Sequence, residues 1–186
     1  MGFIIFLVVL GMLVTWTVIL FNRLVSLRNR RETAFVDMDV QLRLRHDLVP
    51  QLVETVKGYA GHERETLTKV TEARSAAAAA KTIDDKIEAE KKLSAALQGL
   101  HVQLEAYPDL KANQNFLQLQ QKLDEIENRL AATRNYFNSA TMKYNNAVET
   151  FPSNLLAINF GFRRAVMFDL GVASREMMEE PPKVKF

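Results

Sequence analysis

The sequence predicts an all-α protein in which an N-terminal transmembrane helix continues into an antiparallel up-down-up-down helical bundle with long first and last helices. Three observations predict this fold class. Residues 2–21 carry no charged side chain, two long stretches repeat apolar residues about every 3.5 positions, and no stretch shows the sustained period-two alternation of a half-buried strand. We divide the chain into a transmembrane anchor over 1–21, a helical bundle over 22–151 and an irregular aromatic segment over 152–186.

The first segment is long and apolar enough to cross a bilayer. Sixteen of the 20 residues from Gly2 to Phe21 are hydrophobic. At about 1.5 Å of rise per residue, 20 helical residues span roughly 30 Å, the thickness of the hydrocarbon core. A cleaved signal peptide needs a basic leader, a shorter apolar stretch and a small-residue cleavage site, and this segment has none of them. We therefore expect an uncleaved anchor, with a buried core helix as the alternative.

The charges beside the anchor predict its orientation. Arg23, Arg28, Arg30 and Arg31 follow it directly, whereas the N-terminal side offers only the α-amine. The positive-inside rule then places the helical domain in the cytoplasm and the N-terminus outside, for a single-pass protein of the inner (cell) membrane. A secreted or periplasmic orientation is the alternative.

Heptad-like stripes predict the two long helices. In the last one, over 115–151, apolar residues recur at alternating spacings of three and four from Phe116 to Phe151. The first long helix, over 22–57, carries a similar stripe. Pro50 removes one of its helical hydrogen bonds, so we expect a kink there.

Two shorter helices fill the middle of the chain. One runs from about His62 through the alanine run that ends at Ala80, and the next begins at a capping signal at Thr82 and ends before Pro108. Four helices with short connections favour an up-down bundle. Since the middle helices are shorter, part of the long helices stays uncovered, and exposed apolar surface of this kind predicts a homo-oligomer or another membrane-protein partner.

Polar residues within the stripes are candidates for contact positions. Arg31 and Arg45 are interpreted either as partner-recognition residues or as residues of the bundle itself, which snorkel at its edge or form internal salt bridges. An aromatic residue followed by Asn occurs at Phe21, Phe137 and Tyr144, where the Asn either fixes helix register or holds a ligand. The contact residues that we predict are Leu24, Arg31, Arg45, Phe137, Asn138, Tyr144 and Asn145.

The segment after Pro152 combines aromatic and basic side chains, which suits a membrane interface. We expect it either to contact lipid or close an oligomer interface, or to fold back over the end of the bundle. The predicted interface residues are Arg23, Arg28, Phe160, Phe162, Arg163 and Arg164. Anionic headgroups attract such basic residues by about 1 kcal/mol each.

Signatures of enzymes are missing from the sequence. There is no Cys, no phosphate loop and no nucleophile elbow, and His62-Glu63 lacks the second His of a helical zinc motif. We predict no catalytic residue, no cofactor and no metal, with a metal site built from Glu54, Glu63, Glu65 and Glu72 as the alternative. A net charge of +2, with basic residues spread among acidic ones, predicts no nucleic-acid partner.

Several motifs, in order along nearly the whole chain, resemble the LemA family of small membrane-anchored bacterial proteins. The matching stretches are Phe21-Asn22-x-x-Val25, Asp47-Leu48-Val49-Pro50-x-Leu52-Val53-Glu54-x-Val56-Lys57-Gly58-Tyr59, Tyr107-Pro108-x-Leu110-Lys111-Ala112-Asn113-x-Asn115-Phe116, Glu127-x-Arg129, Tyr144-Asn145, Phe151-Pro152-Ser153-Asn154 and Pro182-Lys183-Val184-x-Phe186. Phe137 stands where the family commonly has Tyr, so that hydroxyl is not obligatory.

The resemblance implies an anchored bundle of antiparallel helices with no catalytic residues to carry over. Some relatives help to build magnetosome membranes, and family genes often lie near membrane-protease genes. We therefore expect a non-enzymatic scaffold or adaptor in membrane organisation or quality control, which works through self-association and partner contacts. The alternatives are a metal- or small-ligand-binding helical bundle and direct membrane remodelling.

Overall fold

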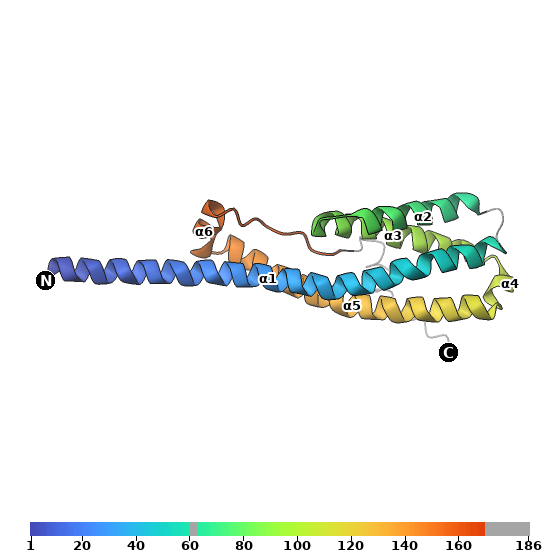
Figure 1. Cartoon of the computed structure of the whole chain (residues 1–186), viewed down its shortest axis with the longest axis horizontal. Helices are drawn as coiled ribbons and strands as arrows, with labels where there is room; N and C mark the ends of the chain where they lie inside the picture. Colours follow the sequence, from blue (N-terminus) through green and yellow to red (C-terminus); the bar gives the residue numbers. More distant parts are fainter. Residues whose placement is uncertain (60–62, 170–186) are drawn as a thin grey trace, which may run out of the picture. The chain divides into compact units, whose positions relative to one another are not determined.

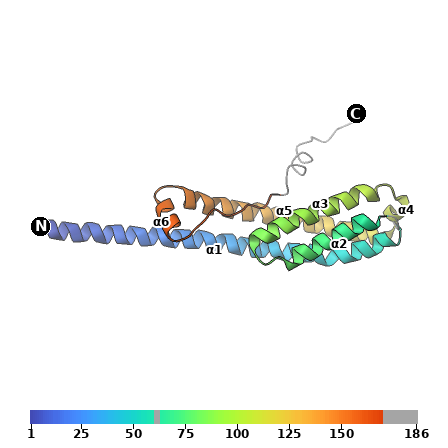
Figure 2. The same ribbon diagram turned by 90° about the horizontal axis from the view of Figure 1, so that it is seen from above.

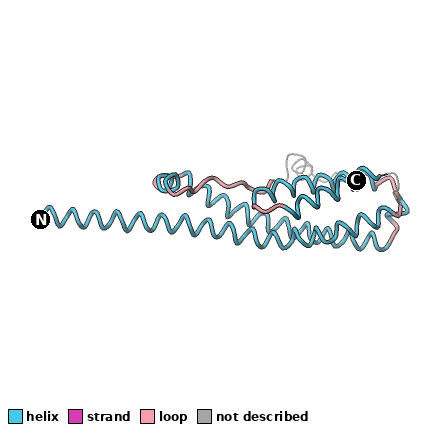
Figure 3. The backbone as a smooth tube through the Cα atoms, turned by 45° about the horizontal axis from the view of Figure 1, so that its top comes forward, coloured by secondary structure: helices cyan, strands magenta, loops and turns pink. Residues whose placement is uncertain are grey.

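A computed structural model describes residues 1–59 and 63–169, and confirms the predicted all-α class. The described residues form helices and loops without a strand (Figures 1 and 3). The helices are α1 (Gly2–Lys57), α2 (Arg64–Ala79), α3 (Ile83–Leu104), α4 (Pro108–Lys111), α5 (Gln114–Glu149) and α6 (Ser153–Asn159). His62 and the Pro182-Lys183-Val184-x-Phe186 motif lie outside the described residues.

The chain forms two compact units, and both α1 and α5 contribute to each of them. Among the described residues, the anchor unit contains 1–38 and 132–167, and the four-helix unit contains 39–59, 63–131, Phe168 and Asp169. This division by compactness falls inside the two long helices. The predicted division at residues 21 and 151 concerns membrane insertion, and it stays a prediction.

The four-helix unit is built around one apolar core. Four helices lie side by side around it: the C-terminal part of α1, α2, α3 and the start of α5 (Figures 1 and 2). The core residues are Val49, Leu52, Val53 and Val56 of α1, Leu67, Val70 and Ala77 of α2, Leu93, Leu100 and Leu104 of α3, Leu110 of α4 and Phe116 of α5. Their spacings of three, four and seven place each set on one helix face. The up-down-up-down order of the helices stays a prediction.

Local sequence signals explain several helix ends. Thr82 caps α3 as expected, since its Oγ1 accepts from the Asp85 amide at 3.1 Å and donates to the Asp85 carboxylate at 2.7 Å. Pro108 occupies the first turn of α4, where its missing N–H is not needed. Sequence periodicity did not predict α4 or α6, because helices of four and seven residues are too short to show it.

The anchor unit has its own small core beside the end of the apolar run. Leu24 of α1 packs with Tyr144 and Ala147 of α5, Ala157 of α6 and Phe162 of the segment that follows. Gly161 has φ of +73° and closes α6 with a hydrogen bond from the Phe162 amide to the Ala157 carbonyl at 2.9 Å. The turn returns the chain toward α1 and α5.

The N-terminal part of α1 stands outside this core. The side chains from Phe3 to Ile19 are exposed, and an 18-residue window reaches a mean hydropathy of 2.8. Among the described residues, α1 alone is long and apolar enough to cross a membrane. This finding is compatible with the predicted anchor.

Pro50 does not end α1, and the structure shows what compensates for it. The helix continues through Pro50 to Lys57. A proline lacks the N–H that would bond to the carbonyl four residues earlier, which here belongs to His46. Arg74 of α2 supplies the missing donor, since its Nε lies 3.2 Å from the His46 carbonyl oxygen. The proline therefore creates an acceptor that ties α2 to α1.

We predict that the cost of removing Arg74 depends on Pro50. Arg74→Met should destabilise the four-helix unit by about 1–2 kcal/mol, because the His46 carbonyl loses its donor. In a Pro50→Ala background the backbone N–H returns, and the same substitution should cost only a few tenths of a kcal/mol. A double-mutant cycle followed by native-state amide exchange measures the difference.

Lys69→Met is the matched control, because Lys69 lies on the same helix and pairs with Glu65 at the surface. Its effect should stay below about 1 kcal/mol. An equal cost for Arg74→Met in both backgrounds would show that the proline and the arginine are not coupled.

Candidate functional site

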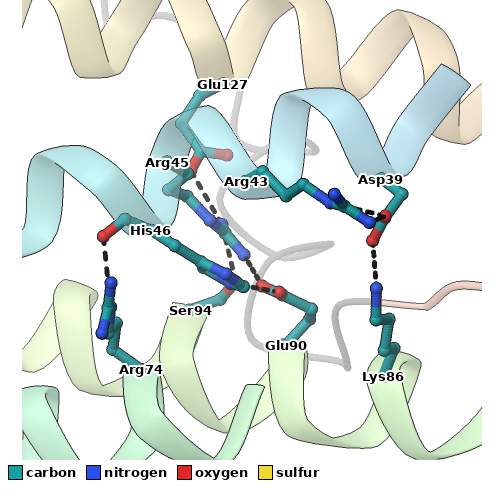
Figure 4. Close-up of polar contacts among 9 residues, drawn as sticks. All are labelled: Asp39, Arg43, Arg45, His46, Arg74, Lys86, Glu90, Ser94 and Glu127. Carbon is teal, nitrogen blue, oxygen red and sulfur yellow. Dashed lines mark hydrogen bonds and ion pairs between the residues drawn. The ribbon is translucent and has the colours of Figure 1, made fainter. Parts of the chain in front are cut away.

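The most polar cluster inside the four-helix unit is centred on Arg45 of α1. The Arg45 side chain is 1% exposed, and so is that of Glu90 on α3, to which its Nη2 donates. Nη1 donates to Glu127 of α5 at 2.8 Å and to Ser94 of α3 at 3.1 Å. Figure 4 shows the guanidinium between these groups. One side chain thus links three helices.

His46 and Glu90 complete the cluster. The His46 Nε2 lies 2.6 Å from the second carboxylate oxygen of Glu90, and since a carboxylate only accepts, the ring nitrogen donates this hydrogen bond. Glu90 therefore receives Arg45 on one oxygen and His46 on the other. The two neighbouring residues of α1 hold the carboxylate from both sides.

The charges of the cluster favour the ion pair. Burial alone lowers the pKa of the Arg45 guanidinium, but the carboxylates of Glu127 and Glu90 outweigh it and raise the pKa above its ordinary value. Arg45 therefore stays protonated at any physiological pH. Glu127 is half exposed, so water reaches this end of the cluster.

A second link between α1 and α3 lies near the cluster. Asp39 accepts from Lys86 of α3 and from Arg43 Nε at 2.9 Å (Figure 4). Burial alone raises the pKa of Asp39, and the two cations together lower it below 3.8. A lowered carboxylate pKa stabilises the fold above the unfolded-state value, and this contribution is lost as the pH falls through the folded-state pKa.

A groove of about 470 Å³ opens beside the cluster. Its polar lining residues are Arg45, Ser94, Gln98, His101, Gln120, Asp124 and Glu127, and Leu52, Leu97, Leu104 and Phe116 are among its apolar ones. This volume is in the range of small-molecule sites. The combination of a buried cation and apolar walls suits a small amphipathic molecule.

No group of three or more His, Asp or Glu side chains in the described part of the chain is placed to hold a metal ion. The four glutamates that we considered as an alternative do not converge. Glu54 pairs with Lys57 at 2.7 Å, Glu65 with Lys69 at 2.6 Å, and Glu63 accepts from the Tyr107 hydroxyl at 3.2 Å.

Most of the predicted contact residues are buried inside the chain. Leu24, Arg31, Arg45, Phe137, Tyr144 and Asn145 are all buried, and Asn138 is half-buried. Arg45 is an internal salt-bridge partner, which was one of its two sequence interpretations. For these buried positions, the structure favours internal packing over contact with a partner.

Arg31 and Asn145 hold the extended segment after α6. The Asn145 amide accepts from the Ala165 N–H at 2.8 Å and donates to the Ala165 carbonyl at 3.0 Å. Arg31 donates to the Val166 carbonyl at 3.3 Å and lies 5.1 Å from the centre of the Phe137 ring. These residues therefore fix the position of backbone groups in a segment that has no secondary structure of its own.

The predicted interface residues differ in exposure. Arg23, Arg28, Phe160, Arg163 and Arg164 are exposed, whereas Phe162 is buried in the core of the anchor unit. The Phe21 ring contacts the rings of Phe160 and Phe162 edge-on, with centres 5.0 and 5.8 Å away. The aromatic segment thus packs on the last residue of the apolar run.

Sequence reasoning missed His46 and Glu90. The buried residues of α3 include Ile87, Glu90, Leu93, Leu100 and Leu104, so Glu90 occupies a position of the apolar stripe. A carboxylate on a buried stripe is the signal that could have found the cluster, because it requires a cation on a facing helix.

Comparison with known proteins identifies a family for this chain. The model of the LemA family matches residues 34–186. A protein named LemA from Metamycoplasma hominis is 27% identical over 158 residues, which cover 83% of this chain and 71% of that protein. Magnetosome proteins MamQ 1 and MamQ 2 from Paramagnetospirillum magneticum are each 34% identical over 73 residues, or 39% of this chain. Those 73 residues are 27% of each magnetosome protein.

We predict that Arg45→Met destabilises the four-helix unit by about 3–5 kcal/mol, because it leaves the buried Glu90 carboxylate without its cation. Arg45→Met combined with Glu90→Met should recover most of this loss. Amide exchange of the α3 core measures both changes in stability.

Arg43→Met is the control, since Arg43 is an exposed arginine of the same helix, and should cost less than about 1 kcal/mol. If Arg45→Met cost no more stability than Arg43→Met, the result would contradict a structural role for the buried pair.

Proposed function

The chain belongs to the LemA family, and from this premise we propose that it is a membrane-anchored, non-enzymatic scaffold or adaptor in membrane organisation or quality control. Its apolar N-terminal helix fits a membrane-associated helical protein. In this proposal the helical units act by self-association and by contacts with other membrane proteins. The proposal also places the helical domain in the cytoplasm and the N-terminus outside.

The observation that carries the proposal is an exposed apolar surface next to the anchor. We call it the α6 surface: it consists of Phe151 (76% exposed), Leu155 (54%), Ile158 (76%) and Phe160 (60%). Contiguous apolar surface of this kind marks a site that a protein or a membrane covers. Phe160 also packs on Phe21, so the α6 surface lies beside the end of the apolar run.

Basic side chains surround this surface and support a position at the bilayer. Arg23, Arg28 and Arg163 are exposed, and Arg28 lies 5.4 Å from the centre of the Phe162 ring. Arg164 pairs with Glu149 at 2.5 Å. Aromatic and basic residues together are typical of the interfacial layer, where anionic lipids attract the cations.

The similarity to two magnetosome proteins supports the part of the proposal that concerns membrane organisation. A magnetosome is a membrane-bounded compartment, and a protein of that compartment works at a membrane. The similarity covers about a quarter of each of those proteins, so their activity as whole proteins is not carried over to this chain.

The orientation can be tested with single cysteines, because the natural chain has none. We expect Gly2→Cys to react with a membrane-impermeant maleimide in intact spheroplasts, because the positive-inside rule leaves the N-terminus outside. Lys122→Cys, an exposed position of α5, should react only after the membrane is permeabilised. The opposite labelling pattern would reverse the proposed orientation.

Self-association through the α6 surface is tested by the double substitution Leu155→Ser with Ile158→Ser. Both side chains are exposed, so the fold should be retained while the apolar surface is lost. We expect the wild type to form oligomers in native membranes, as measured by amine crosslinking, and the double variant to remain monomeric. Val102→Ser, which removes an exposed apolar side chain from α3, is the control and should leave the oligomer unchanged. A monomeric wild type, or a variant that still forms oligomers, would contradict self-association through this surface.

A further inference from the structure

A groove in the anchor unit joins the end of the apolar run to α5. Its volume is about 450 Å³, and we call it the anchor groove. Its lining residues are Leu20, Arg23 and Leu27 of α1, Lys143, Asn146 and Ala147 of α5, Thr150, Phe151 and Pro152 of the connection to α6, and Ser153 at the start of α6.

The helix periodicity explains why these residues line one groove. Leu20, Arg23 and Leu27 are separated by three and four positions, so they share one face of α1. The three residues from α5, Lys143, Asn146 and Ala147, are three and four positions apart from Lys143, so they also share a face. Each wall of the groove thus combines a basic side chain with apolar ones.

The charge of the groove is positive and uncompensated. Arg23 and Lys143 are exposed, and neither forms an ion pair with another described residue. None of the lining residues is acidic. Glu149, the acidic residue beside Thr150 in the sequence, is paired with Arg164. Two cations therefore face a shared space with no counter-ion from the anchor unit.

One further lining residue, Asn146, can donate hydrogen bonds to an anion. The Asn146 side chain is exposed, and its amide can donate two hydrogen bonds. The Thr150 hydroxyl donates its proton to the Asn146 backbone carbonyl, so it has no donor left for an anion. The arginine fork can in addition bind two oxygens of one phosphate.

The position of the groove along α1 matches the headgroup layer of a bilayer. The apolar run ends at Phe21, so Leu20 lies within it, and Leu27 lies six residues beyond it. At about 1.5 Å per residue the groove extends roughly 9 Å past the hydrocarbon core. The headgroup region adds about 5–8 Å on each side of that core.

We propose that the anchor groove binds the headgroup of an anionic phospholipid. This inference rests on the proposed membrane anchoring. Arg23 and Lys143 bind the phosphodiester, Asn146 donates to its oxygens or to the ester carbonyls, and Leu20, Leu27 and Phe151 contact the glycerol and the first methylenes.

The lining of the groove discriminates between related ligands. A zwitterionic choline headgroup brings a cation next to Arg23 and Lys143, which repel it. Inorganic phosphate satisfies the two cations but leaves the apolar walls uncovered. An anionic lipid matches both the charge and the apolar surface, and its acyl chains continue along α1 into the bilayer.

Trp16 provides a direct probe of this site. It is the single tryptophan of the chain and lies four residues before Leu20, on the same face of α1. The acyl chains of a lipid seated in the groove therefore pass it. The full-length protein is reconstituted into mixed vesicles of phosphatidylglycerol and phosphatidylcholine, with bromine on the chains of one lipid at a time. Quenching of Trp16 fluorescence then gives the relative affinity for the two lipids.

We expect brominated phosphatidylglycerol to quench several-fold more effectively than brominated phosphatidylcholine. Arg23→Gln and Lys143→Gln should each reduce this preference by about fivefold, the effect of one basic residue near an anionic surface. The double variant should quench equally with both lipids. Arg30→Gln is the control, because this exposed arginine of the same helix does not line the groove. Arg30 lies nine residues beyond Phe21, about 13 Å past the apolar run, where salt screens its attraction to the headgroups. This substitution should change the preference by less than about twofold.

Other results of the quenching experiment would contradict the proposal. Equal quenching of the wild type by both lipids, or an equal loss in Arg30→Gln, would leave only general attraction and refute the groove as a site. Loss of the preference on adding inorganic phosphate, at an ionic strength held constant with chloride, would make free phosphate the ligand. Absence of quenching by either lipid would refute the anchoring itself, and with it the proposed function.

Discussion

The four-helix unit depends on the buried ion pair between Arg45 and Glu90. Two charged side chains that are each 1% exposed would be costly without each other. Their geometry admits one arrangement of helices, because the Arg45 guanidinium must reach Glu90 on α3 and Glu127 on α5 at once. An apolar core alone tolerates a shift of a helix by one turn with similar burial, whereas this pair does not. We therefore assign it a role in fixing the register of α1, more than in adding stability.

The neighbouring Pro50 extends the same constraint to the remaining helix. It leaves the His46 carbonyl without a helical donor, and Arg74 of α2 provides one. His46 also holds Glu90 through its ring. The stretch from Arg45 to Pro50 thus contacts α2, α3 and α5 through polar groups, within little more than one turn of α1. The apolar residues that follow, Leu52, Val53 and Val56, pack against the helices that these polar contacts hold in register.

The sequence predicts those features that periodicity or a local signal encodes. The long helices, the Thr82 cap and the exposed apolar run could be found because each repeats a pattern or uses a short motif. The partners of the polar residues could not, since a contact such as Arg45 with Glu90 joins positions 45 residues apart. Sequence reasoning did not find that Arg31 and Asn145 bind the backbone of the chain's own extended segment, and their contact with a partner stays a prediction. The extended segment after α6 has no periodicity, so its sequence does not predict where it packs. Arg31 and Asn145 on the buried stripes did indicate that polar groups lie opposite them.

The distribution of apolar surface in the anchor unit connects these results to function. The side chains of the stripe residues Leu24, Phe137 and Tyr144 are buried inside the anchor unit, so they form little of its surface. Exposed apolar residues also follow the end of the stripe, at Phe151 and on α6. Stability does not require them there, because a solvent-exposed Phe or Ile contributes nothing to the core. Phe160 packs on Phe21, so this surface lies beside the end of the apolar run. In the proposed function a bilayer that receives the apolar run would also reach this surface. The regular stripes therefore build the packed interior of the unit, and the residues from Phe151 through α6 carry the apolar surface that it exposes.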